Sequence, residues 1–189
     1  DLCKEKNIHL AINHFRRSDS FFIDLKKNII NHNFGEIQHI NFYYTRGIAN
    51  SGSHLFDLIR FLFGEVKSIN SIFSINDIKN DPTLSCNLEM EKNFLCNLIG
   101  LNGNFYRIFN LEIFGSKSKI LIDTSKNITF LKSKPSNRSS EFYELYEHSF
   151  SQIENNQNEQ VFINSLSNII NCIEKNTQLN CDGMDGYKS

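Results

Sequence analysis

The hydrophobic pattern of this chain changes period several times, and these changes divide it into expected strands and helices. Residues 37–44 place Ile40, Phe42 and Tyr44 on one face and polar side chains between them, which is typical of a half-buried strand. Asn102-Gly103 predicts a tight hairpin between the strands on either side of it, because these residue types accept positive φ. Further strands are expected at 66–75, in two runs within 84–101, and at 107–114, 119–122 and 128–131, with a loop over 133–141.

Apolar residues at helical spacing predict three helices. The first is expected over 18–31 with Ser18 or Ser20 as its cap, the second over 54–63, and the third over 157–176. The third has the clearest apolar stripe, and it consists of Phe162, Leu166, Ile169, Ile170 and Ile173. Before them, the short apolar run at 8–12 predicts a strand buried on both faces.

The start of the second helix carries polar side chains that packing does not require. Asn50, His54 and Asp57 are three or four positions apart, so they share one face of a helical turn. Ser51 or Ser53 is expected to cap this helix by accepting a hydrogen bond from a backbone N–H. This polar face is therefore the first candidate for chemistry.

Strands that follow one another, without helices between them, favour an α+β fold. We expect a largely antiparallel, mixed sheet of about six strands with helices on one face. The other sheet face should be solvated or covered by a partner, and aromatic residues favour a partner and an oligomer interface there. These aromatic residues are Tyr43, Phe94, Phe105, Tyr106 and Phe109.

Composition and charge exclude several classes of protein. The 189 residues carry 20 basic and 21 acidic side chains that are interleaved, so no basic stripe predicts binding to nucleic acid or to an anionic membrane. No apolar run approaches a membrane span and no signal peptide is recognisable, which makes the cytoplasm the expected compartment. The five cysteines lack metal-binding spacing and the histidines do not cluster with carboxylates, so we expect no metal site.

Four motifs occur in order along the first two thirds of the chain. They are Ile8 to Ile12 followed by Arg16-Arg17, then Gly35-Glu36-Ile37, then Gly52-Ser53-His54-Leu55-Phe56-Asp57 with Gly64-Glu65-Val66, and finally Leu111-Glu112-Ile113-Phe114-Gly115-Ser116-Lys117. Together they resemble the Gfo/Idh/MocA oxidoreductases. Members of that family join an N-terminal Rossmann domain, which binds NAD or NADP, to an α+β domain that binds substrate and forms the oligomer.

The resemblance covers the second domain only. Residues 1–12 would be the remnant of the end of the Rossmann domain, and residues 13–189 the C-terminal α+β domain. The chain has no Gly-x-Gly-x-x-Gly turn after a strand and no Glu-Lys-Pro segment, whose lysine is catalytic in the family. We therefore expect this fragment to bind no dinucleotide and to be inactive, whereas the parent protein uses NAD or NADP. The implied partners are the missing Rossmann domain, a sugar-like substrate, and further copies of the chain in a dimer or tetramer.

The resemblance also assigns roles to the polar face. His54 matches the catalytic histidine, which accepts the substrate hydroxyl proton, and the positive end of its helix would keep the imidazole neutral. Asp57 would support it, and Asn50 stands where many members have an aspartate. Arg16 and Arg17 match an arginine pair of which one member commonly lies near the interdomain cleft.

Structural and non-catalytic alternatives to these roles remain. His54 could be a structural histidine bonded to Asp57, and Asn50 could simply cap the helix. Because Asn50 cannot act as a base, the domain could also be a non-catalytic scaffold that binds a small ligand or builds an oligomer. A free-standing α+β enzyme ranks last, because Asp57 is the one further catalytic candidate near His54.

Overall fold

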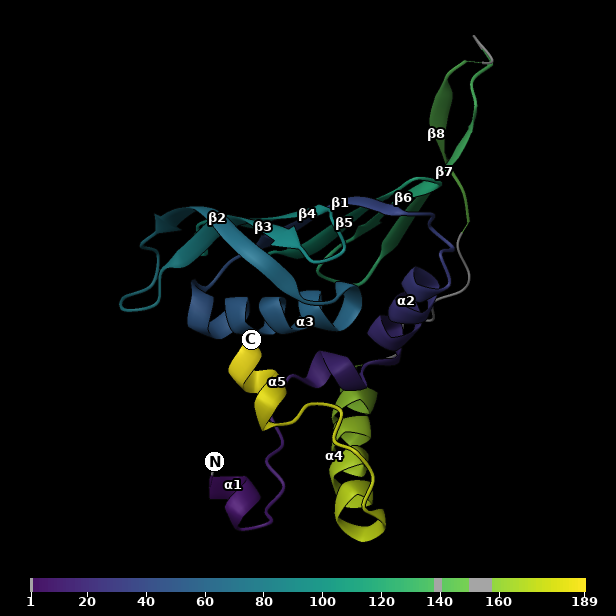
Figure 1. The fold of residues 1–189 in the computed structure, drawn as a ribbon. Helices are drawn as coiled ribbons and strands as arrows, with labels where there is room; N and C mark the ends of the chain where they lie inside the picture. Colours follow the sequence, from purple (N-terminus) through teal and green to yellow (C-terminus); the bar gives the residue numbers. More distant parts are fainter. Residues whose placement is uncertain (1, 138–140, 150–157) are drawn as a thin grey trace.

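The computed structural model describes residues 2–137, 141–149 and 158–189. Within these ranges, eight strands form one sheet and the helices lie on one side of it (Figure 1). The elements in chain order are α1 Leu2–Glu5, η1 Phe15–Ser18, α2 Ser20–Ile30, β1 Ile37–Tyr44, η2 Gly47–Gly52, α3 Ser53–Phe63, β2 Val66–Ile75, β3 Thr83–Met90, β4 Leu95–Gly100, β5 Phe109–Gly115, β6 Ser118–Ile122, β7 Ile128–Pro135, β8 Tyr143–Glu147, α4 Asn158–Lys175 and α5 Gly183–Lys188.

The sheet confirms the expected α+β class and corrects its details. The strand order is β2-β3-β4-β1-β5-β6-β7-β8, which is eight strands where about six were expected. Strands β1 and β4 are parallel, and each other adjacent pair in this described sheet is antiparallel. The end of β7, residues 133–135, lies in the region expected to be a loop, of which residues 138–140 lie outside the described part of the chain. Strand β8 follows where no strand was expected, and the antiparallel pair of β7 and β8 projects from the sheet (Figure 1).

The predicted hairpin at Asn102-Gly103 is wrong. Strand β1 lies between β4 and β5, so the two strands on either side of this dipeptide do not pair with each other. Instead, the Asn102 side chain accepts a hydrogen bond from the backbone of Asn104, and the Gly103 N–H donates to Asp77. The dipeptide does form a turn, but this turn belongs to a connection that joins β4 to β5 across β1, which lies between them.

The core lies between the sheet and the helices α2 and α3. Ile40, Phe42 and Tyr44 of β1 are fully buried on the helix side, as the alternation of this strand predicts. Helix α2 is capped by Asp19 rather than by Ser18 or Ser20, since the Asp19 side chain accepts from the Phe21 N–H. Gly64 ends α3 as expected, with a φ of 102° that favours glycine.

The open face of the sheet is polar at its centre. His39 and Asn41 of β1 are hydrogen-bonded to each other and to Asn97 of β4, and Asn41 also donates to Glu112 of β5. Of the five aromatic residues expected here, Phe94 is buried against Phe63 and Phe109 packs on Phe42, both on the helix side. Phe105 and Tyr106 are exposed, but they lie in the connection between β4 and β5. Tyr43 is the one of the five that lies on the open face, where it is half-buried in β1, so the five do not form the expected aromatic patch.

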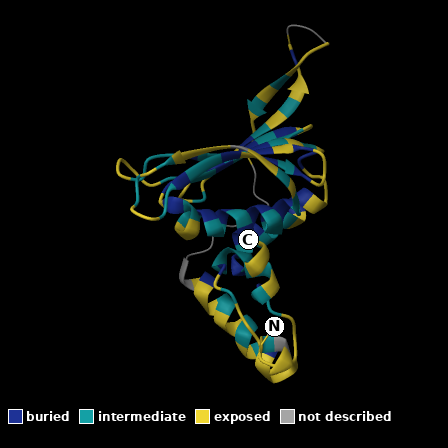
Figure 2. Cartoon of the chain, turned by 60° about the vertical axis from the view of Figure 1, so that its left-hand side comes forward, coloured by how far each residue is buried: buried dark blue, intermediate teal, exposed yellow. Residues whose placement is uncertain are grey.

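The far side of the helices leaves apolar residues uncovered. Helix α4 forms as predicted, yet Phe162, Leu166, Ile170 and Ile173 of its stripe are 52–69% exposed, and Figure 2 shows this helix largely exposed. The run at 8–12 is not the buried strand that was expected. It forms one isolated bridge, Ala11 with Asp182, because no strand lies alongside it among the described residues.

Tyr44 provides a test of the core. Its hydroxyl donates to the Leu84 carbonyl at 2.8 Å and accepts from the Leu84 N–H at 2.9 Å. We expect Tyr44→Phe to lower the free energy of unfolding by about 1–2 kcal/mol in urea denaturation, because both groups of Leu84 lose their partner. Tyr106→Phe, at an exposed tyrosine, is the control and should be neutral. Equal effects of the two substitutions would contradict this reading.

Candidate active site at the start of helix α3

The helix that carries His54 begins earlier than the sequence indicates. A π-helical turn, Gly47–Gly52, runs directly into α3, so Gly52 is itself helical and no side chain caps α3. Ser53 donates its hydroxyl to the carbonyls of Ala49 and Asn50 instead of acting as a cap. The predicted caps Ser51 and Ser53 are therefore wrong, because the wider turn continues the helix past them.

Asp81 fixes the π-helical turn from outside. Its two carboxylate oxygens accept hydrogen bonds from the N–H groups of Ala49 (2.8 Å) and Asn50 (3.2 Å). Gly47 has a φ of 74°, and a Cβ atom there would lie 2.1 Å from the Asp81 carboxylate. Only glycine fits at this position. Asn50 is exposed, and it precedes His54 by four residues in the continuous helical segment.

His54 is half-buried and contacts a second histidine. Its Nδ1 lies 3.3 Å from Nδ1 of His14, and its ring lies 5.5 Å from the ring of Phe15. A hydrogen bond between two Nδ1 atoms needs one donor and one acceptor, so the accepting ring is neutral. When His54 is the donor, its Nε2 is free to accept a proton.

The surroundings of both histidines disfavour their charged forms. Burial lowers the pKa of His54, and the positive charge of Arg16 and then His14 lowers it further, against an opposing effect of Asp57. Burial also lowers the pKa of His14. His54 is therefore neutral near pH 7, as the sequence predicts. Burial and the neighbouring cations are the main causes of the lowered pKa, and the positive end of the helix is not required to explain it.

Asp57 and Arg17 form a buried ion pair beneath His54. The Arg17 guanidinium binds the Asp57 carboxylate through Nη2 at 2.9 Å and through Nε at 3.0 and 3.1 Å. It also binds Asp185 at 3.0 Å and the carbonyl of Asn180 at 3.2 Å. Burial opposes the charge of Arg17, but the hydrogen bond and charge of Asp57 outweigh it and raise its pKa. Both residues thus hold the C-terminal segment against α3.

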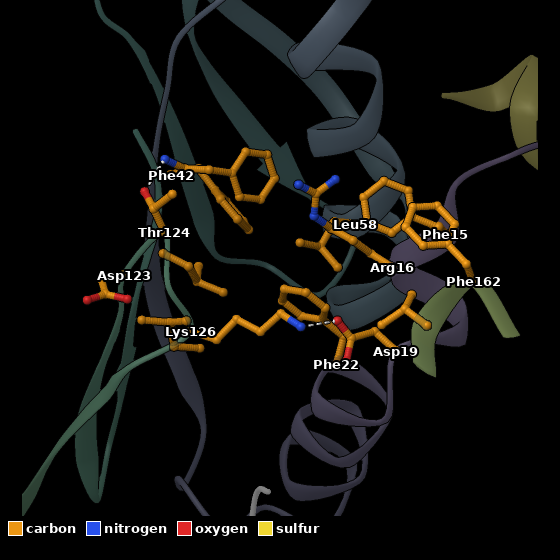
Figure 3. Close-up of a pocket in the computed structure, with 14 residues that line it drawn as sticks. Phe15, Arg16, Asp19, Phe22, Phe42, Leu58, Asp123, Thr124, Lys126 and Phe162 are labelled. Atoms are coloured by element: carbon orange, nitrogen blue, oxygen red, sulfur yellow. Dashed lines mark hydrogen bonds and ion pairs between the residues drawn. The ribbon is translucent and has the colours of Figure 1, made fainter. Parts of the chain in front are cut away.

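Arg16 points the other way, into a cavity of about 340 Å³ between the helices and the sheet (Figure 3). Its guanidinium lies 4.1 Å from the centre of the Phe109 ring and 4.9 Å from that of Phe15. Burial lowers the pKa of Arg16 to about 10, although Asp19 and Asp57 act in the opposite direction. Of the two arginines in the motif, Arg16 is thus the one that faces a cavity.

The sequence analysis predicts Arg16 but not the other polar residues of this cavity, which are Asp19, Asp123, Thr124 and Lys126. Lys126, in the turn between β6 and β7, places its Nζ 2.6 Å from Asp19 Oδ2 (Figure 3). The turn is built by Asp123, whose carboxylate accepts from the backbone N–H groups of Ser125 and Asn127. A lysine in a short turn carries no signal of its own, and nothing in the sequence links it to a residue more than one hundred positions earlier.

Within the described ranges, no three His, Cys, Asp or Glu side chains are grouped so as to hold a metal ion. None of the described helices combines the length and the apolar character needed to cross a membrane.

Comparison with known proteins shows what this fold is. No family profile and no curated protein matches the sequence. Solved structures do match. They include a candidate NADPH-dependent oxidoreductase from Desulfitobacterium hafniense (TM-score 0.77, 15% identity, 99% of this chain and 61% of that one). The UDP-N-acetylglucosamine 3-dehydrogenase GnnA from Acidithiobacillus ferrooxidans also matches (0.67, 13%, 99% and 60%). So does the WlbA dehydrogenase from Bordetella pertussis, solved with NADH and UDP-GlcNAcA (0.68, 17%, 98% and 60%).

The chain has a Gfo/Idh/MocA-type fold. The resemblance drawn from the motifs is thus confirmed at the level of the fold, at identities of 13–17%. The chain spans only 60–61% of the length of these structures while being covered almost completely itself.

The ion pair beneath His54 can be tested by stability. We expect Asp57→Asn to reduce the free energy of unfolding by about 3 kcal/mol, because it leaves the buried Arg17 charge with too little compensation. Asp24→Asn removes an exposed pair with Lys27 and should cost no more than about 0.5 kcal/mol. Denaturant titrations of both variants decide the matter, and a small effect at Asp57 would show that the pair is dispensable.

The histidine pair has a pH signature. We expect the ring C–H resonances of His14 and His54 to titrate below the ordinary pKa of 6.5 in the folded chain. The unfolded chain therefore binds protons at a higher pH than the folded chain does. The contribution of the two histidines to the free energy of unfolding is fully present above pH 6.5 and is lost as the pH falls below it. NMR titration measures this directly, with the same chain in concentrated urea as the reference. Midpoints at or above the urea values would refute the assignment.

Proposed function

We propose that this chain is the substrate-binding domain of an NAD(P)-dependent dehydrogenase that oxidises a hydroxyl of a sugar, polyol or nucleotide sugar. The supporting observation is His54, a neutral, half-buried histidine that contacts Phe15 of the cavity wall, in a chain that has the fold of NAD(P)-dependent oxidoreductases. Two of the matching structures, GnnA and WlbA, are named as dehydrogenases, and their names or bound ligands include a nucleotide sugar.

The chemistry assigned to this chain is proton transfer and positioning. A neutral His54 accepts the proton of the substrate hydroxyl, as a general base with a pKa near or below the working pH can do. Arg16 orients the substrate from the cavity wall, while Asp57 and Arg17 hold α3 and the C-terminal segment in place. Asn50 contributes a hydrogen bond at most, because an amide cannot take the proton.

The nicotinamide cofactor belongs to a different part of the parent protein. None of the described residues forms a strand, glycine-rich turn and helix of the kind that holds a pyrophosphate, so this chain does not fit a dinucleotide. When bound to an N-terminal Rossmann domain, NAD or NADP supplies the acceptor for the hydride. We propose that residues 1–12 end that domain and that residues 13–189 form the domain described above.

The exposed side of α4 is where we place the missing domain. Its apolar stripe is 52–69% exposed, and nearby Ile8 is 61% exposed, which is an unusual amount of uncovered apolar surface for a folded domain. The stripe begins next to the site, because the Phe15 ring lies 5.5 Å from both Phe162 and His54. A domain docked on α4 would therefore face His54.

We assign oligomer formation to the opposite surface. The open sheet face has a centre of hydrogen-bonded side chains, and none of the described helices covers it, so a second copy in a dimer or tetramer would bury it. Position 50 favours one alternative function. If the loss of an aspartate there abolishes chemistry, the domain is a non-catalytic scaffold that binds a small ligand or builds the oligomer.

The test is a substitution in the full-length protein that contains this chain. We expect His54→Ala to lower turnover by about 10²–10⁴-fold, the usual contribution of a general base, with nicotinamide binding near normal. His32→Ala, at an exposed histidine in the turn after α2, is the matched control and should leave turnover unchanged. Steady-state kinetics with NAD and NADP, together with cofactor titration, give both readouts. Unaltered turnover in His54→Ala would exclude the catalytic role and favour the scaffold.

A further inference from the structure

The cavity that Arg16 enters is lined by two cations and two carboxylates, but only one of the cations has an ion-pair partner among the described residues. Arg16 and Lys126 both line it, and Asp19 is the one carboxylate that contacts either of them through an ion pair within the described residues. Asp123 also lines the cavity, but its carboxylate is occupied by Ser125 and Asn127 and points away from the centre (Figure 3). One cation is therefore left without an anionic partner.

The donors of both cations are unused. Among the described residues, no oxygen accepts a hydrogen bond from the Arg16 guanidinium, whose contacts are the rings of Phe15 and Phe109. Lys126 Nζ is buried, and Asp19 Oδ2 lies close but outside hydrogen-bonding geometry. Ring faces compensate part of a buried charge but leave the planar N–H donors of a guanidinium unpaired. Such donors normally find an acceptor.

The shape of the cavity suits a small anionic molecule. A volume of about 340 Å³ is in the range of ligand pockets, and phenylalanine rings make up much of its wall. A guanidinium matches the two oxygens of a carboxylate or phosphate better than any other acceptor. Arg16 and His54 both contact Phe15, which lines the cavity, and the charge of Arg16 is close enough to lower the pKa of His54.

We propose that Arg16 binds the anionic group, carboxylate or phosphate, of the substrate whose hydroxyl is presented to His54. This inference rests on the proposed function and narrows its substrate class from sugars, polyols and nucleotide sugars in general to those that carry an anionic group for Arg16. Asp19 does not oppose such a ligand. Its carboxylate is already engaged by the Phe21 N–H through Oδ1 and by Lys126 through Oδ2.

Calorimetric titration of the 189-residue chain with three probes tests the proposal. The probes are glucuronate, glucose 6-phosphate and neutral glucose. We expect at least one anionic probe to bind about tenfold or more tightly than glucose, the ordinary effect of a hydrogen bond to a charged group. The stronger of the two anions identifies the source of the charge. Equal affinity for all three probes, or no binding of either anion, overturns the proposal.

Arg16→Met separates recognition from folding. The variant should bind the anionic probes no better than glucose, while Lys26→Met, which removes a cation that rests on the Phe61 ring outside the cavity, should retain the preference. The melting temperature of Arg16→Met should be no lower than that of the unaltered chain, because a buried cation without an acceptor is lost. A preference that survives in Arg16→Met contradicts the assignment, and so does a preference lost equally in Lys26→Met.

This experiment does not depend on turnover. If Arg16→Met loses the preference for anions and His54→Ala keeps full turnover, the anion subsite stands and the catalytic role of His54 is refuted. The reverse pair of results would retain the dehydrogenase and refute the anionic substrate. The two proposals thus fail separately.

Discussion

The ion pair between Arg17 and Asp57 is the interaction on which the candidate site depends. It joins η1 to α3, and through Asp185 and the Asn180 carbonyl the same guanidinium holds the C-terminal segment. Successive residues of a 3₁₀ turn point about 120° apart, so an Arg17 fixed towards α3 sends Arg16 to another side. One arginine is therefore structural because it is paired, and its neighbour is available because it is not.

Elements with a purely local signal could be predicted from the sequence. The alternation of β1 and the helical spacing of α3 depend on which face is buried, and the core buries the expected faces. The Asn102-Gly103 hairpin was wrong because a dipeptide specifies a turn but not the strand that lies beside it. The buried strand predicted at 8–12 is wrong for a related reason. An apolar run shows that a segment is suited to burial, but it does not specify which element will cover the segment. The same holds for the stripe of α4.

The site was predictable to the extent that its residues lie in short motifs. The spacing of His54 and Asp57 and the adjacent arginines could be read directly, but their separate roles could not, because these follow from tertiary contacts. Lys126 is the clearest example of a cavity residue that the sequence does not predict. It reaches the cavity from a turn between two sheet strands, and only the packing of that turn against α2 brings it to Asp19.

Asp19 connects two parts of the molecule with a single carboxylate. Oδ1 accepts from the first turn of α2, and Oδ2 neutralises Lys126 in the cavity. Any ligand that changes the position or charge of Lys126 therefore changes the field at the start of α2. By thermodynamic reciprocity, any change in the stability of that first turn alters the affinity of the cavity by the same coupling free energy. The helix cap and the pocket are thus linked equilibria rather than independent features.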